Sequence, residues 1–477
     1  MYDMKFGRSH VQFLNGIADI LIDGGHELVA VSNVFDERLE HVGSTRVAKR
    51  YVVPHSQGAK KQPFGGYSSN AWNAKSIMDM VVKSQYFDAN FFDGITQQCD
   101  LMLKNAELIE SLRAEKIDVA YAENFDRCAF VLFHLAGIDK VAITDSHSTL
   151  GDGFRTTGAP NMHAYVPSRY AGFGEQMTFM ERMENLLIDY YMNYMIFSFE
   201  WWMIDYFALN YPDVPHVEEL LSNVSLVFLN RAPLVDFPQV TTHKIVDIGG
   251  FLIQRSNASL DKEWDSLLSL RVKTVLISFG SVALSVDMPV EFKESIIRLA
   301  RLHPDITFIW KYEKPEEALT EGVENLVLKK WIPQKELLAD PRLSAFITHS
   351  GAFSTLEILT AGKPVIAVPL TSDQHRNAQM LKRNGVGIVY DKHLLGDTAL
   401  LSATLDNVLH GTRFSDQASK VARMLQDEPF SPREKLLRGM EFLARHGPLP
   451  QLHHYGTKLN FLKCVCMISR AAKSKTE

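Results

Sequence analysis

The sequence is poor in cysteine, has no block of basic residues and lacks a cluster of metal ligands. Its 477 residues include four cysteines, too few for a disulfide framework: Cys99, Cys128, Cys464 and Cys466. The last two could share a metal ion, but no second group of cysteine and histidine completes such a site. Lysine and arginine occur singly or in pairs and the net charge is −6, which argues against a nucleic-acid-binding surface.

Segments that direct a chain to a membrane are also missing. The first residues, MYDMKFGRSH, contain no apolar core of a signal peptide. The stretch FLKCVCMIS near the end has nine residues, less than half of the roughly 20 that a helix needs to cross a bilayer. The aromatic stretch 190–209 is interrupted by Asn193, Glu200 and Asp205, so it predicts a buried or interfacial helix.

Strand and helix patterns alternate along the whole chain, which is typical of parallel α/β sheets. A polar, glycine-bearing stretch at 249–261 separates two such halves. The fold class is therefore α/β, with two doubly wound Rossmann-like domains facing across a cleft. The domain boundaries follow the composition: an N-terminal domain at 1–255, a C-terminal domain at 256–430, and helices that pack back with a residual tail at 431–477.

The N-terminal sheet is expected to lack its first strand. A parallel sheet of this kind normally has a strand before its first helix. The first helical pattern covers residues 11–21, and only Met1 to Lys5, a poor strand pattern, precede Phe6.

Neither half opens with G-x-G-x-x-G, which argues against a nicotinamide oxidoreductase. Instead, FITHSGAFSTLEILTAGKPVIAVPLTSDQ at 346–374 places His349 and Ser350 at a turn from a strand into a helix. The unpaired N–H groups and the dipole of a helix N-terminus bind phosphate. Ser354 could add a hydrogen-bond donor beside these N–H groups and Glu357 could add an acceptor, with a capping box, S-x-x-E, as their alternative reading.

The stretch WIPQKELLADPRLSAFITHSGAFSTLEILTAGKPVIAVPLTSDQHRNA resembles the signature of UDP-glycosyltransferases, the glucuronosyl and glucosyl transferases of small lipophilic molecules, in an invertebrate, nematode-type form. The resemblance extends from Phe6 to about Lys458. It implies the GT-B fold, UDP-glucose or UDP-glucuronic acid as co-substrate, a small lipophilic acceptor with a hydroxyl, and no cofactor or metal. It also makes homo- or hetero-oligomers with other family members an open possibility.

The resemblance implies a UDP-sugar site of nine residues: Ser281, Trp331, Gln334, His349, Gly351, Ser354, Glu357, Asp373 and Gln374. The tryptophan would stack on uracil and the first glutamine would bind the nucleoside. The serines, the histidine and the glycine would hold the diphosphate, the glutamate the ribose, and the last two residues the transferred sugar. Phe353 departs from the family pattern, which has Asn there. A phenyl ring cannot donate a hydrogen bond to phosphate, so donor binding is expected to be weakened or altered.

The same resemblance places the catalytic base at His10, in FGRSHVQF. A neutral imidazole can take the proton of a hydroxyl acceptor near pH 7. Glu123 stands where the family has the aspartate that orients this base, and Asp126 is the alternative. By composition alone, His10 would be an ordinary histidine at the start of a helix.

The implied reaction is inverting transfer of a hexose, with no metal, and no metal-binding D-x-D occurs in the chain. The alternative is an inactive truncated homologue that binds UDP-sugar or aglycone, or a regulatory partner of full-length transferases. The family lies in the endoplasmic reticulum membrane with lumenal catalytic domains. Without a signal peptide or membrane helix, this chain is expected to be soluble or truncated.

Overall fold

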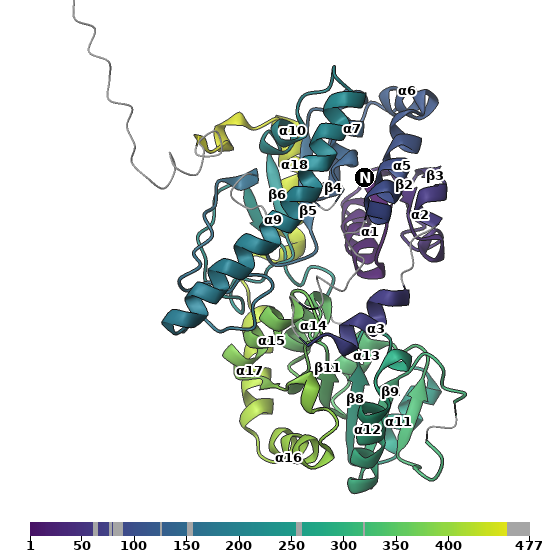
Figure 1. The fold of residues 1–477 in the computed structure, drawn as a ribbon, viewed down its shortest axis with the longest axis vertical. Helices are drawn as coiled ribbons and strands as arrows, with labels where there is room; N and C mark the ends of the chain where they lie inside the picture. Colours follow the sequence, from purple (N-terminus) through teal and green to yellow (C-terminus); the bar gives the residue numbers. More distant parts are fainter. Residues whose placement is uncertain are drawn as a thin grey trace, which may run out of the picture.

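The computed structural model describes residues 1–60, 65–75, 79, 89–124, 126–149, 156–253, 260–317 and 320–455. Two α/β bodies lie end to end, the N-terminal one in the upper half of Figure 1 and the C-terminal one below it. The expected domain boundary between residues 255 and 256 falls outside the described residues. Cys464, Cys466 and the rest of the tail from residue 456 also lie outside them.

The strands are β1 (Tyr2–Lys5), β2 (Val29–Val34), β3 (Lys49–Val53), β4 (Ala120–Glu123), β5 (Val141–Asp145), β6 (Leu226–Leu229), β7 (Ile245–Asp247), β8 (Lys273–Ser278), β9 (Ile306–Lys311), β10 (Leu326–Lys329), β11 (Leu343–Thr348), β12 (Val365–Ala367) and β13 (Gly387–Val389). The helices are α1 (Arg8–Asp23), α2 (Gln57–Lys60), α3 (Gly65–Asn73), α5 (Ala89–Leu103), α6 (Ala106–Ala114), α7 (Cys128–Leu135), α9 (Phe179–Asn210), α10 (Val217–Ser222), α11 (Lys262–Ser269), α12 (Val290–Leu302), α13 (Gln334–Ala339), α14 (Ala352–Ala361), α15 (Gln374–Arg383), α16 (Thr398–Leu409), α17 (Arg413–Gln426) and α18 (Pro432–His446).

All of the paired strands are parallel. The N-terminal body holds the orders β1-β2-β3 and β4-β5-β6-β7, with β1 lying beside β4, so the two short sheets continue one another. The C-terminal body holds one six-stranded sheet in the order β10-β9-β8-β11-β12-β13. Ligands of such sheets bind beyond the carboxyl ends of the strands, so the site is sought at these ends.

The expectation that the first strand is missing is wrong. Residues Tyr2–Lys5 form β1, which is fully buried and pairs in parallel with β2. The charged residues Asp3 and Lys5 interrupt the apolar pattern expected of a buried strand, but inside the sheet they pair with one another. Lys5 Nζ donates to Asp3 Oδ2 and to the Val42 carbonyl, and Asn15 Nδ2 donates to the same aspartate at 3.1 Å. A buried charge is tolerated when it is paired in this way.

Two features of the N-terminal body were not expected from the sequence. Residues 89–114 form two helices and not one, because Asn105 Oδ1 accepts a hydrogen bond from Leu108 N at 3.0 Å and so caps α6 after α5 has ended at Leu103. In addition, Cys99 of α5 and Cys128 of α7 form a disulfide.

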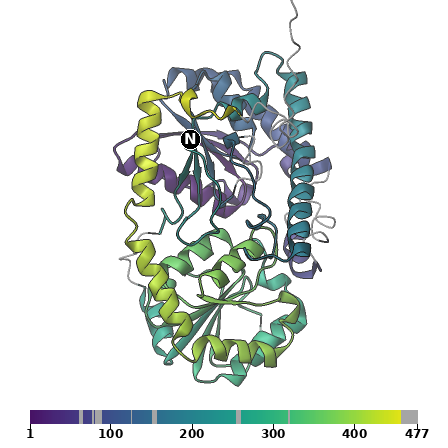
Figure 2. The same ribbon diagram turned by 90° about the vertical axis from the view of Figure 1, so that its left-hand side faces the viewer.

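The last described helix, α18, returns from the C-terminal body to the N-terminal one, on the left in Figure 2. Leu436, Met440 and Leu443 on this helix are buried in one apolar cluster with Phe13 of α1 and Phe228 of β6. Among the described residues, no helix, not even the 32-residue α9, is both long and apolar enough to cross a membrane.

Candidate functional site

A cavity of about 1010 Å³ lies between the two bodies and is lined by residues at the carboxyl ends of strands from both, among them Glu123 of β4 and Ser278 of β8. It is lined by all nine residues of the expected donor site and by His10 and Glu123. Asp126 is not among the lining residues. Residues from both bodies therefore meet at one cleft large enough for two small substrates.

His10 lies in the first turn of α1, close behind the turn that leaves β1. Gly7 makes this turn with a φ of 72°, and a Cβ there would lie 2.9 Å from His10 Cδ2. His10 Nδ1 is 2.9 Å from Glu123 Oε1, at the end of β4. The same oxygen accepts a hydrogen bond from Ser146 N at 3.0 Å. With Nδ1 turned to the carboxylate, Nε2 is the imidazole nitrogen that points away from Glu123.

His10 and Glu123 shift each other's pKa in opposite directions. Burial opposes a charged imidazole, but the carboxylate of Glu123, followed by Asp145, outweighs it and raises the pKa of His10 above its usual 6.5. Burial alone would raise the pKa of Glu123, yet His10, Ser146 and His147 lower it to about 2. Glu123 is therefore ionised and stabilises a proton on His10.

Asp126, the alternative partner, serves another purpose. Its Oδ2 accepts a hydrogen bond from the Tyr2 hydroxyl and its Oδ1 accepts one from Cys128 N at 2.9 Å. These contacts tie β1 to the start of α7, and neither reaches His10.

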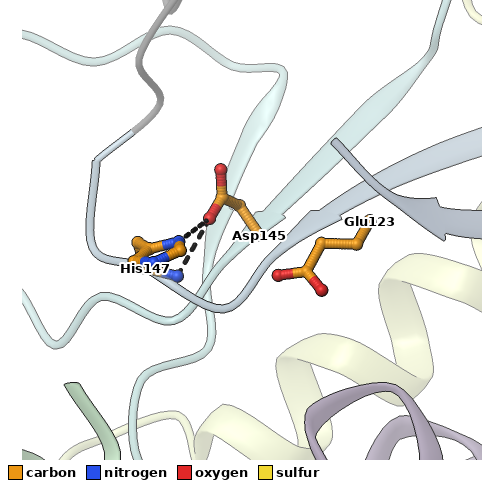
Figure 3. Close-up of side chains that lie close together, drawn as sticks. All are labelled: Glu123, Asp145 and His147. Atoms are coloured by element: carbon orange, nitrogen blue, oxygen red, sulfur yellow. Dashed lines mark hydrogen bonds and ion pairs between the residues drawn. The ribbon is translucent and has the colours of Figure 1, made fainter. Parts of the chain in front are cut away.

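Asp145 and His147 were not expected from the sequence, and they lie close to Glu123 (Figure 3). His147 Nδ1 and its backbone N–H both lie 2.9 Å from Asp145 Oδ1, and the His147 ring is 5.5 Å from that of His10. Together with Glu123, they could bring one ligand atom each within 4.8 Å of the others, as a metal site requires. Glu123 Oε1 already faces His10 and Ser146, and Asp145 Oδ1 already faces His147, which favours a hydrogen-bond network. The position of Asp145 at the carboxyl end of β5 is the signal that could have found it.

At the donor end, Gln334 links two of the expected residues. Its Nε2 donates to Ser354 Oγ at 3.0 Å and to Glu357 Oε2 at 2.6 Å. The capping-box reading of Ser354 and Glu357 is wrong, because α14 begins at Ala352 and its cap, Gly351, makes no side-chain capping bond. Both side chains face the cavity instead, and burial raises the pKa of Glu357.

His349 follows β11 and its ring is held between two glycines. A Cβ on either Gly280 or Gly351 would lie 2.7 Å from His349 Nε2. Burial, together with the nearby Lys311, lowers the pKa of His349 to about 4, so the imidazole is neutral and donates from one nitrogen only. Ser281 follows Gly280 at the end of β8 and lines the same side of the cavity.

Asp373 caps α15, Gln374 is its first residue, and both line the cavity. Gln374 Oε1 accepts hydrogen bonds from Leu370 N at 2.9 Å and Thr371 N at 3.1 Å, and Asp373 Oδ2 accepts one from Asn377 Nδ2 at 2.7 Å. These bonds fix both side chains at the wall of the cavity. Carboxylate and amide groups of this kind suit sugar hydroxyls.

Phe353, the departure from the signature, packs edge-to-face on Phe13 of α1 with ring centroids 6.0 Å apart. It therefore joins the two bodies through an apolar contact that the sequence did not reveal. From the N-terminal body, Tyr170 and Met192 also line the cavity. The side chains of the aromatic stretch at 193–202 lie outside the described residues.

Comparison with known proteins matches residues 4–464 to the model of one family, described as UDP-glucoronosyl and UDP-glucosyl transferase. A Caenorhabditis elegans protein named provisionally as UDP-glucuronosyltransferase ugt-48 is 27% identical over 97% of this chain and 88% of its own length. Human UDP-glucuronosyltransferase 1A1 is 25% identical over 93% of this chain and 82% of its own. A UDP-glucosyltransferase from Polygonum tinctorium, solved in complex with 3,4-dichloroaniline, superposes with a TM-score of 0.60 at 15% identity, covering 94% of this chain and 98% of that one. The last likeness confirms the expected GT-B fold.

Proposed function

Since the chain belongs to the UDP-glucoronosyl and UDP-glucosyl transferase family and so transfers a sugar from a UDP-sugar, we propose that His10 is the base of a single inverting displacement onto a hydroxyl of a small lipophilic acceptor. The observation that carries this proposal is the His10–Glu123 pair, at 2.9 Å, in the same cavity as the nine donor-site residues. The transferred sugar is a hexose, glucose or glucuronic acid.

In the proposed reaction the acceptor hydroxyl gives its proton to His10 Nε2 while its oxygen attacks C1 of the sugar. The bond between C1 and the diphosphate oxygen breaks at the same time, and UDP leaves from the opposite face. Glu123 stabilises the imidazolium that forms. The N-terminus of α14 and His349 stabilise the negative charge that develops on the diphosphate, so no metal is needed for this step.

The disulfide between Cys99 and Cys128 supports an oxidising compartment for this chemistry, such as the lumen of the endoplasmic reticulum. That compartment is where the family's catalytic domains work.

The experiment that tests the proposal measures UDP release from UDP-glucose and from UDP-glucuronic acid, each with and without a simple phenol. We expect acceptor-dependent release with one of the two donors. If calorimetry detects UDP binding while no donor gives acceptor-dependent release, the chain is a binding homologue and the proposal is wrong.

The pH dependence of kcat/KM is expected to follow the protonation of His10. The base works only when it is neutral, so the rate falls as the pH drops through a pKa raised above 6.5. Glu123→Gln removes the charge that raises this pKa, so the acid limb moves to lower pH and kcat falls by a factor on the order of 10²–10⁴. Profiles of both proteins, with the exposed Glu110→Gln as control, measure the shift. An acid limb that stays in place in Glu123→Gln contradicts the assignment.

Gly351→Ala is expected to displace His349 and weaken UDP binding about tenfold to a hundredfold, as when a hydrogen bond to a charged group is lost. Its φ of −59° accepts alanine, so the effect comes from the Cβ 2.7 Å from His349 Nε2 and not from backbone strain. Gly396→Ala is the matched control, since its Cβ would meet nothing closer than 3.8 Å. Calorimetric titration with UDP compares the three proteins. If Gly351→Ala binds UDP with wild-type affinity, His349 does not contact the diphosphate.

A further inference from the structure

A cation of the N-terminal body lies over the indole of Trp331, which belongs to the C-terminal body. The guanidinium carbon of Arg8 lies 4.4 Å from the centroid of the Trp331 ring. Arg8 is the first residue of α1, two positions before His10, whereas Trp331 precedes α13. The contact therefore crosses the cleft and connects the helix of the proposed base to the proposed uracil site.

Arg8 has no competing partner at its inner nitrogen. Its Nε is buried and makes no hydrogen bond among the described residues. A second cation, Lys311 Nζ, is 5.9 Å from the same ring centroid. That ammonium is already held by the Gly280 carbonyl at 2.8 Å and by Glu313 Oε1 at 2.9 Å. Arg8 is thus the cation committed to the indole, and a planar guanidinium can stack on an aromatic face where an ammonium cannot.

The indole nevertheless remains open. Trp331 is 53% exposed, although Arg8 covers one of its faces, and its surface lines the cavity. With Arg8 over one face, the exposed surface of the ring that lines the cavity is where a second planar group can stack.

We propose that Arg8 is a positioning residue for the donor, which holds Trp331 from one face while the uracil of the UDP-sugar stacks on the other. This inference rests on the proposed function, because it takes Trp331 as the uracil platform. An indole that Arg8 already holds in place loses less conformational freedom when uracil binds. Arg8 also connects Trp331 to α1. Binding of uracil in the C-terminal body therefore helps to hold His10, in the N-terminal body, over the sugar.

A double-mutant cycle on UDP binding tests the inference without any turnover. The four proteins are wild type, Arg8→Ala, Trp331→Ala and the double variant, each titrated with UDP in a calorimeter. Arg8→Ala is expected to weaken UDP binding about threefold to tenfold, the range of a partly desolvated cation–aromatic contact. In the Trp331→Ala background the same change is expected to have no further effect. Arg8→Lys keeps the charge but not the planar stack, so it is expected to bind UDP nearly as weakly as Arg8→Ala.

Turnover gives the second readout. Arg8→Ala is expected to raise the KM for the UDP-sugar and to leave the KM for the acceptor unchanged. The control is Arg38→Ala, whose exposed guanidinium pairs with Asp36 away from the cavity. The inference is wrong if Arg8→Ala loses the same UDP affinity in the wild-type and in the Trp331→Ala background. It is also wrong if Arg8→Ala binds UDP more tightly than wild type, since the guanidinium would then occupy the place of the uracil. If the wild-type chain binds no UDP at all, the donor site itself is contradicted and the role of Arg8 falls with it.

Discussion

His10→Ala is expected to lower the rate of sugar transfer by a factor on the order of 10²–10⁴, the usual contribution of a positioned base. The reason is local: a hydroxyl acceptor is a poor nucleophile until its proton is taken, and the His10–Glu123 pair is built to take it. UDP affinity is expected to stay near that of wild type, because all nine expected donor-site residues belong to the C-terminal body. Acceptor-dependent UDP release and calorimetric titration with UDP measure the two effects separately.

The matched control is His26→Ala, on the loop after α1. His26 is also a histidine paired with a carboxylate, Glu441, but it lies at the surface, and it does not line the cavity. It should retain full activity. If His10→Ala keeps more than about a tenth of the wild-type rate, a loss too small for a general base, another residue takes the proton.

Arg376→Met is expected to destabilise the chain by about 3–5 kcal/mol, the usual cost of leaving one partner of a buried ion pair alone. Arg376 Nη2 lies 2.8 Å from Asp236 Oδ1, and the side chains are 1% and 2% exposed. The same guanidinium donates to the Pro167 carbonyl at 3.2 Å and to Ser148 Oγ at 3.0 Å. It therefore fastens α15 to three separate segments of the N-terminal body.

Denaturant unfolding of the whole chain measures this loss, and two further variants interpret it. Arg383→Ala, on the same helix, breaks a half-exposed pair with Glu175 and should cost about 0–1 kcal/mol. Arg376→Met combined with Asp236→Leu leaves no charge buried alone, so it should recover much of the lost stability. Because Asp373 and Gln374 lie one turn before Arg376, the single variant should also raise the KM for the donor. A loss no larger than that of Arg383→Ala would contradict this account of the cleft.

The residues that the sequence pointed to lie mostly where a strand ends and a helix begins. His349, Ser281 and Asp373 each follow a strand of the C-terminal sheet, and the parallel order of that sheet brings the strand ends to one edge. A strand–helix pattern carries this information locally, which is why the fold and the donor end of the cavity could be predicted.

Other features depend on contacts that no local pattern records. β1 was missed because Asp3 and Lys5 look like surface residues until the ion pair between them is seen inside the sheet. Arg376 stands in a helix with a polar sequence and gives no sign of its partner 140 positions earlier. Phe353 was read as a lost hydrogen-bond donor, whereas its ring also packs on Phe13 across the cleft.

The configuration of the product tests the central claim most directly. An α-linked UDP-sugar, the donor that supports UDP release, is incubated with a phenol and a metal chelator, and the glycoside is identified by nuclear magnetic resonance. A single displacement with His10 as base predicts a β-linked glycoside, formed only when acceptor is present and unaffected by the chelator. An α-linked product, or no glycoside from a chain that binds UDP, would contradict it.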